Sequence, residues 1–263
     1  MPTPTDLAAY DISKLKLGKQ AAVHPAGLSH LTAYTTTEFP KPPATFGTLS
    51  KLQSIPWGMD GNDSLLDCTI AAADHVIARE NAIEHTSDAR PDLAIIESQY
   101  RYFSPNDDGC VIANVLQAWS TLGLFRHMPT GPNKIRQYVP FNYQNKTELQ
   151  QVIAYLGVAY IGIACPQSAQ QQFAMQIQTG KLVPWTVVNG SPSDGGHCIV
   201  AVGYNAKGLL CVTWGGIVLV TWAFMTKYCD EAWAILTQEI AEHGADTFGI
   251  KTAELQADLD ALT

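Results

Sequence analysis

The sequence predicts an α+β chain with two lobes, the first mainly helical and the second rich in antiparallel strands. Residues 1–55 are rich in proline, residues 56–140 carry mostly helical patterns, and residues 141–240 carry most of the strand patterns. Helical and strand patterns that occupy separate parts of a chain are typical of the α+β class. We therefore expect an extended arm at 1–55, a helical lobe at 56–140, a β-rich lobe at 141–240 and a C-terminal tail at 241–263.

The composition is that of a globular chain and disfavours several classes of function. Hydrophobic residues make up 46% of the 263 positions, and the net charge is −8 with no basic segment. Nucleic-acid binding is therefore disfavoured. No apolar run is long enough to span a membrane, and the first residues do not resemble a signal peptide, so we expect neither membrane association nor classical secretion. The six cysteines form no CxxC pair, which indicates reduced thiols, with no metal or organic cofactor expected.

The arm contains Pro25, Pro40, Pro42 and Pro43, which prevent a long helix. A short stretch in which lysines alternate with leucine and glycine, residues 14–19, precedes them. We expect this arm either to lie on the body of the protein or to reach a partner.

The helical lobe places a cysteine at the start of a helix. The pattern of residues 67–82 predicts a helix with Asp67 as N-cap and Cys68 in the first turn. Unpaired N–H groups and the helix dipole there favour a thiolate and lower the pKa of a thiol. His75 lies two turns further along the same helix, so we expect a structural role for it. Two further helices are expected at 95–102 and 111–122, with a loop at 124–140.

The second lobe places a histidine at the start of a strand. Helices are expected at 146–155, 167–178 and 218–229, and a buried strand at 159–165. A hairpin of strands is expected at 197–204 and 209–214, and a last strand at 231–236. His197 follows two glycines at the start of this hairpin, where a ring can be fixed and still be accessible.

Cys68 and His197 together suggest nucleophilic catalysis. A thiol nucleophile needs a base within hydrogen-bond reach, and that base is normally remote in the sequence. The alternative for each residue is structural: a buried thiol and a histidine that only packs.

Residues 60–237 resemble papain-like cysteine peptidases. The nucleophile position is similar at Asp67-Cys68-Thr69, and the stretch from Gly196 to Tyr204 matches the histidine strand. Thr213-Trp214-Gly215 is similar to the family's Asn-Ser-Trp-Gly element. The resemblance implies a papain-like two-lobed fold with a barrel-like β lobe. The chain also resembles uncharacterised bacteriophage and prophage proteins through a further set of short motifs: Trp57–Met59, Gly61–Asp63, Asp67-Cys68 and Tyr228–Ala232.

The resemblance implies a role for each matching residue. Cys68 would be the nucleophile and His197 the general base and acid. Asn62, six residues before the cysteine, stands where the family has an oxyanion-hole glutamine. The residue that orients the histidine would be Thr213 or Val212, depending on the alignment; only threonine can bond to the ring. The substrate cleft would be lined by Gly61, Gly196 and Trp214.

Two functions of different classes follow. The first is a cysteine hydrolase that acts on a peptide, isopeptide or amide bond in a peptide or protein substrate. The second is a catalytically degenerate relative that acts by binding phage structural proteins, because the family's asparagine is missing and fold does not fix function. We expect the protein in the bacterial cytoplasm or in a phage virion.

Overall fold

The computed structural model of the chain describes residues 11–83, 88–238, 240–241 and 248–262. The first residues of the chain, on which the expectation about a signal peptide rests, lie outside these ranges. No helix within the described ranges is both long and apolar enough to cross a membrane.

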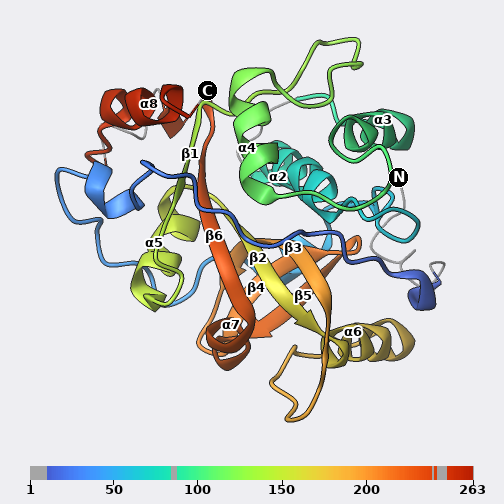
Figure 1. Ribbon diagram of the computed structural model, residues 1–263. Coiled ribbons are helices and arrows are strands. Elements are labelled where there is room, and N and C mark those ends of the chain that lie inside the picture. Colours follow the sequence, from blue (N-terminus) through green and yellow to red (C-terminus); the bar gives the residue numbers. More distant parts are fainter. Residues whose placement is uncertain (1–10, 84–87, 239, 242–247, 263) are drawn as a thin grey trace.

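Six strands of the described chain form one antiparallel sheet, in the order β1-β6-β2-β3-β4-β5. Their bounds are Gln137–Pro140 for β1, Ala159–Pro166 for β2, Ser193–Tyr204 for β3, Gly208–Thr213 for β4, Gly216–Thr221 for β5 and Cys229–Leu236 for β6. The sheet is strongly twisted, and β1 and β5 are its edges (Figure 1). The strand-rich lobe is thus one antiparallel sheet, as the α+β class predicted.

The helical lobe is built around α2 (Cys68–Ile83), which packs against β3. Every residue of α2 from Cys68 to Arg79 is buried, because α3 (Leu93–Phe103) and α4 (Ile112–Thr121) cover it on the other side (Figure 1). The run Ala71-Ala72-Ala73 allows this close approach, since alanine adds little volume beyond the backbone. The cysteine that begins α2 is therefore held deep in the molecule.

The remaining helices lie around the sheet. They are α1 (Leu49–Gln53), α5 (Lys146–Tyr155), α6 (Gln167–Thr179), α7 (Trp222–Tyr228) and α8 (Thr252–Asp260), with short 3-10 helices η2 (Ile12–Lys14) and η3 (Leu31–Tyr34) in the arm. Asn145 caps α5 by accepting hydrogen bonds from Thr147 and Glu148, and Gly180 ends α6 in the left-handed conformation.

Two expectations about secondary structure were wrong. The segment 218–229, expected as one helix, is the end of β5 followed by α7, because the β-branched run after Gly216 pairs with β4 along its length. The segment 124–140, expected as a loop, ends in β1, which pairs with β6. Four residues are too few to show a strand period, so only the tertiary pairing reveals β1.

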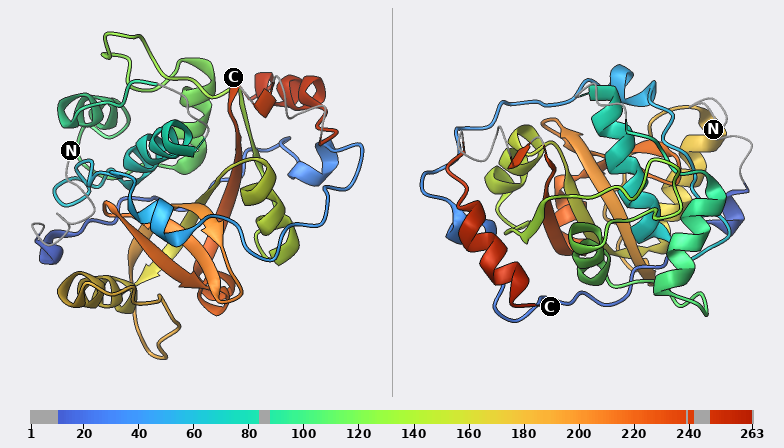
Figure 2. Two further views of the ribbon diagram at one scale, coloured as in Figure 1. Left: turned by 180° about the vertical axis from the view of Figure 1, so that it is seen from behind. Right: turned by 90° about the horizontal axis from the view of Figure 1, so that it is seen from above.

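The arm lies on the body of the protein, as one of the two expectations had it. Its residues 15–20, here called the strap, pass between the helical lobe and the sheet (Figures 1 and 2). Lys19 forms a parallel bridge to Cys110, which precedes α4, and an antiparallel bridge to Gly196 on β3. The strap therefore joins the two lobes through its backbone.

Candidate functional site

His197 lies on β3 and is fully buried. Its Nε2 is 2.6 Å from the Oγ1 of Thr213, the last residue of β4, which pairs with β3. The ring of Trp214 stacks on the imidazole, with centroids 4.5 Å apart and planes at 21°. Trp214 has a positive φ of 45° and is followed by Gly215 at 74°, so the tight turn after β4 folds the indole back over the histidine.

Thr213, rather than Val212, is the residue that reaches the histidine ring. Burial lowers the pKa of His197 to about 3, and the charge of His75 contributes further. The imidazole is therefore neutral at neutral pH. Its other nitrogen, Nδ1, is buried and has no hydrogen-bond partner among the described residues.

Cys68 begins α2 and is 1% exposed. Burial raises the pKa of its thiol to about 11, although hydrogen bonds from the backbone of Gly18 and Cys198 act in the opposite direction. The prediction that the helix N-terminus lowers the pKa of Cys68 was therefore wrong. The cost of burying a thiolate is larger than the dipole effect, which is modest even at the first turn. The thiol is neutral at neutral pH.

Cys68 and His197 come to the same region of β3, but no hydrogen bond joins them. The sulfur accepts a hydrogen bond from the backbone of Cys198, the residue directly after the histidine. The unpartnered Nδ1 shows that the thiol does not donate to the ring. Of the residues predicted from the sequence, His197, Thr213 and Trp214 form one contacting group, and Cys68 is linked to it only through the backbone of Cys198.

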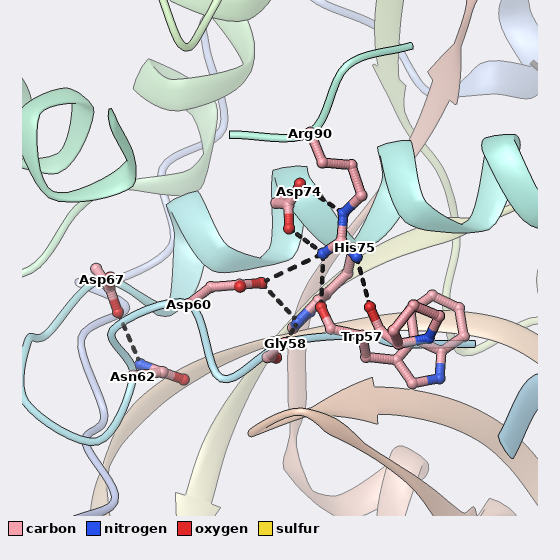
Figure 3. Close-up of polar contacts among 9 residues, drawn as sticks. Trp57, Gly58, Asp60, Asn62, Asp67, Asp74, His75 and Arg90 are labelled. Carbon is pink, nitrogen blue, oxygen red and sulfur yellow. Dashed lines mark hydrogen bonds and ion pairs between the residues drawn. The ribbon is translucent and has the colours of Figure 1, made fainter. Parts of the chain in front are cut away.

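Asn62 is buried, but its amide does not face the thiol. Its Nδ2 donates to Asp67 Oδ1 at 3.2 Å (Figure 3). Burial raises the pKa of Asp67 well above its ordinary value, and the charge of Asp60 raises it further. A Cβ on Gly61 would lie 2.6 Å from Asp67 Oδ2, so this glycine packs against the same carboxyl. The oxyanion role implied for Asn62 and the cleft position implied for Gly61 therefore stay predictions.

A second polar cluster surrounds His75, whose structural role agrees with the expectation. Its Nε2 lies 3.1 Å from Gly58 O and 3.2 Å from Asp60 Oδ2 (Figure 3). Beside it, Asp74 forms a buried ion pair with Arg90. These contacts attach the loop before α2, and the segment after it, to the middle of the helix.

The strap contacts most of the residues predicted for the site. Lys16 N donates to Asn62 O at 2.9 Å, and Trp214 Nε1 donates to Lys16 O at 3.3 Å. Lys19 N donates to Gly196 O at 2.9 Å. A Cβ on Gly196 would overlap the carbonyl oxygen of Lys19, so the glycine permits this close approach. The strap thus lies along the surface on which a substrate cleft was expected.

The side chain of Lys19 enters a buried acidic pocket that sequence reasoning missed. Its Nζ lies 3.0 Å from Asp230 Oδ2 and 3.2 Å from Glu231 Oε1. The signal was present: two adjacent acids near the start of β6, an otherwise apolar strand, and Lys19, one of five lysines in the arm. Nothing in the sequence shows that these distant charges meet.

A polar surface cavity of about 230 Å³ lies elsewhere, beside α4, β1 and α8, and Gln117, Lys134 and Tyr138 are among its lining residues. It contains none of the predicted site residues. No group of three or more His, Cys, Asp or Glu side chains suited to a metal ion occurs within the described ranges.

Comparison with known proteins gives a fold but no close relative. No protein-family model matches the chain, and no curated protein matches it. Among solved structures, the chain is similar to xylellain, a cysteine protease from Xylella fastidiosa, with a TM-score of 0.58 and 14% identity over 85% of this chain and 97% of that one.

Two cathepsin structures give the same result. A digestive procathepsin L2 proteinase from Tenebrio molitor larval midgut matches with a TM-score of 0.60 and 13% identity, over 89% of this chain and 80% of that one. A procathepsin B from Trypanosoma congolense matches with a TM-score of 0.56 and 12% identity, over 86% of this chain and 88% of that one. The fold is thus the two-lobed α+β fold of papain-like cysteine proteases. At these identities the likeness concerns the fold, not the activity.

Proposed function

We propose that the protein is a cysteine hydrolase that cleaves a peptide, isopeptide or amide bond, with Cys68 as nucleophile and His197 as base and acid. One observation carries the proposal. An extended segment of the chain itself, the strap, is bonded through its backbone to Cys110 of the helical lobe and to Gly196, the residue before His197 on β3. Backbone pairing of this kind accepts any extended peptide, whatever its side chains.

The proposed reaction is a thiol-dependent acyl transfer followed by hydrolysis. The Cys68 sulfur attacks the carbonyl carbon of the bound peptide, forming a thioester while the bond to the amine breaks. His197 takes the thiol proton and passes it to the leaving amine, and water then hydrolyses the thioester. Thr213 holds the ring through Nε2, which leaves Nδ1 to exchange the proton. The backbone N–H of Cys68, at the start of α2, supplies a donor for the oxyanion.

The structure corresponds to a closed form in this proposal. The strap contacts the neutral thiol through Gly18, and the neutral imidazole is covered by Trp214, which donates to Lys16 of the strap, whereas catalysis needs both groups to exchange protons with substrate and water. Displacement of the strap would expose the two groups to solvent and bring their pKa values toward ordinary ones, because burial is the main cause of both shifts.

The test is the covalent intermediate. With activated peptide esters, mass spectrometry should detect an acyl group on Cys68 in the full chain with the strap released, and a Cys68→Ala or His197→Ala variant should abolish it. Cys211→Ala is the matched control, since Cys211 is an equally buried thiol on β4. An acyl group that forms equally well in the His197→Ala variant would contradict the assigned roles.

A second candidate is a catalytically degenerate protein that binds other proteins, phage structural proteins among them, through the same surface. The observations that favour it are the unpartnered Nδ1 of His197 and the bond from Asn62 to Asp67, which takes the amide away from the thiol. This candidate predicts that peptides bind once the strap is released and that no acyl group ever forms on Cys68.

A further inference from the structure

The cavity beside α4, β1 and α8 is bounded by three segments that are distant in the sequence. Helices α4 and α8 flank the end of the sheet that carries β1 (Figures 1 and 2). The cavity volume of about 230 Å³ equals that of roughly eight water molecules at about 30 Å³ each. The cavity is therefore large enough for a small organic molecule and too small for a long peptide.

The segment that leads into β1 brings positive charge to this cavity. Lys134 and Arg136 both line it, and neither forms an ion pair within the described ranges. Lys134 Nζ donates to the backbone oxygen of Thr121, the last residue of α4, at 2.7 Å, which holds the ammonium group at the cavity wall. In a chain with a net charge of −8, two such cations at one cavity are suited to bind an anion.

Tyr138 of β1 adds an unused hydrogen-bond donor. It lines the same cavity, is 1% exposed, and its hydroxyl makes no hydrogen bond with the part of the chain that the structure describes. Burial raises the pKa of Tyr138 to about 12, so the phenol keeps its proton at neutral pH. Buried hydroxyls normally have a partner, and an acceptor in the cavity would supply one.

Helix α8 brings an acid and an apolar residue to the cavity. Asp260, at the end of α8, lines it and accepts a hydrogen bond from Gln256 Nε2 at 2.7 Å. A carboxylate has about four acceptor positions, so it can accept from an ammonium group as well. Leu259 of α8 and Ile135 also line the cavity, and both are buried. The lining thus combines cations, an anion and two aliphatic side chains.

We propose that this cavity binds a free α-amino acid with an aliphatic side chain. Its carboxylate pairs with Lys134 and Arg136 and accepts from the Tyr138 hydroxyl. Its ammonium group pairs with Asp260, and its side chain contacts the aliphatic residues of the lining. A simple amine would meet the two cations, and a dianion would meet Asp260, so a zwitterion suits both charged walls. The site contains neither Cys68 nor His197 and does not depend on the proposed hydrolase function.

Arg136 should contribute most to the affinity. A guanidinium group can donate to both oxygens of a carboxylate at once, whereas the ammonium group of Lys134 already donates to Thr121. Hydrogen bonds to charged groups are stronger than those between neutral groups, and the loss of one corresponds to about tenfold in affinity or more.

The experiment titrates the full chain with leucine and follows binding by saturation-transfer difference NMR at neutral pH. Leucine should saturate the signal with a dissociation constant of about 1 mM or lower. Two analogues test the two charged groups separately. 4-Methylpentanoate lacks the ammonium group and 3-methylbutylamine lacks the carboxylate, and each should bind at least about tenfold more weakly than leucine.

Variants of exposed residues locate the site without disturbing the core. Arg136→Met should weaken leucine binding at least about tenfold. Arg126→Met is the matched control, because Arg126 is also exposed and lies over the ring of Tyr102, outside the cavity lining. Asp260→Asn, which keeps an oxygen for Gln256, should weaken the binding of leucine and leave that of 4-methylpentanoate unchanged.

Three results would overturn the inference. The first is the absence of saturable leucine binding to the unaltered chain. The second is equal affinity for leucine and 4-methylpentanoate, which would remove the role of Asp260. The third is unchanged leucine binding in Arg136→Met, which would place the amino acid elsewhere on the protein.

Discussion

Gly18→Ala should open the site without disturbing the fold around it. A Cβ built on Gly18 overlaps the carbonyl oxygen and carbonyl carbon of Leu66, which are backbone atoms of the helical lobe. A rotamer change cannot relieve an overlap with backbone, so the strap must leave its position. Cys68 lies directly beneath and should become accessible.

The expected size of the effect follows from the bonds that the strap loses. Three backbone hydrogen bonds tie Gly18, Lys19 and Gln20 to Cys110 and Gly196. Each contributes about 1 kcal/mol net, so their loss shifts the closing equilibrium by about 3 kcal/mol, or about 100-fold. Separation of the Lys19 ion pairs adds to this, and we therefore regard 100-fold as a lower bound.

The assay is the rate at which iodoacetamide labels Cys68, measured by peptide mapping near neutral pH. Gly18→Ala should label Cys68 about 100-fold faster than the unaltered chain, with Cys211, which is buried on β4, unchanged. Val23→Ala is the control, because Val23 lies on the same arm and is 46% exposed. If a folded Gly18→Ala protein labels as slowly as Val23→Ala, the strap does not shield the thiol.

Three further predictions concern the site and its support. Thr213→Val should slow acylation in the strap-released protein about tenfold, while Thr213→Ser should not, because only the hydroxyl reaches the imidazole. In the unaltered protein, Asp67 should make the free energy of unfolding fall as the pH rises, and Asp67→Asn should remove this fall. The raised pKa of Asp67 makes the folded state hold a proton that the unfolded state releases, at up to about 1.4 kcal/mol per pH unit above pH 4. Parallel urea-melt curves from pH 4 to 8 for the two proteins would contradict this.

Arg90→Met should cost about 3–5 kcal/mol of unfolding free energy by leaving Asp74 unpaired, whereas Arg101→Met, in a surface pair, should cost under about 1 kcal/mol.

Long, strongly patterned elements were predictable from the sequence. The helix that begins at Cys68, the helix 146–155 and the hairpin of β3 and β4 occur where expected, because an apolar stripe or a turn of polar residues and glycine marks each of them. The short strand β1 and the strand β5 were not predictable, because their strand character comes from pairing with β6 and β4.

Contacts within the site were predictable from the sequence only between residues on adjacent strands of the sheet. Thr213 and His197 come together because β3 and β4 are adjacent, so a hairpin pattern is sufficient to pair them. The contacts of the Lys19 side chain depend on three segments that are distant in the sequence: the strap, β2 and β6. Sequence patterns report local periodicity and do not report which distant charges meet.

The pKa of Cys68 shows why the local rule failed and how the closed form is stabilised. The helix N-terminus favours a thiolate, yet the strap excludes the water that would solvate the charge, and burial dominates. The same segment supplies the cation that Glu231 and Asp230 need. The strap therefore has two effects: it keeps the Cys68 thiol buried and neutral, and it places the Lys19 cation beside Asp230 and Glu231. Displacement of the strap would leave Glu231 buried and without its counter-ion. The buried charges around Lys19 thus oppose opening of the strap and favour the closed form.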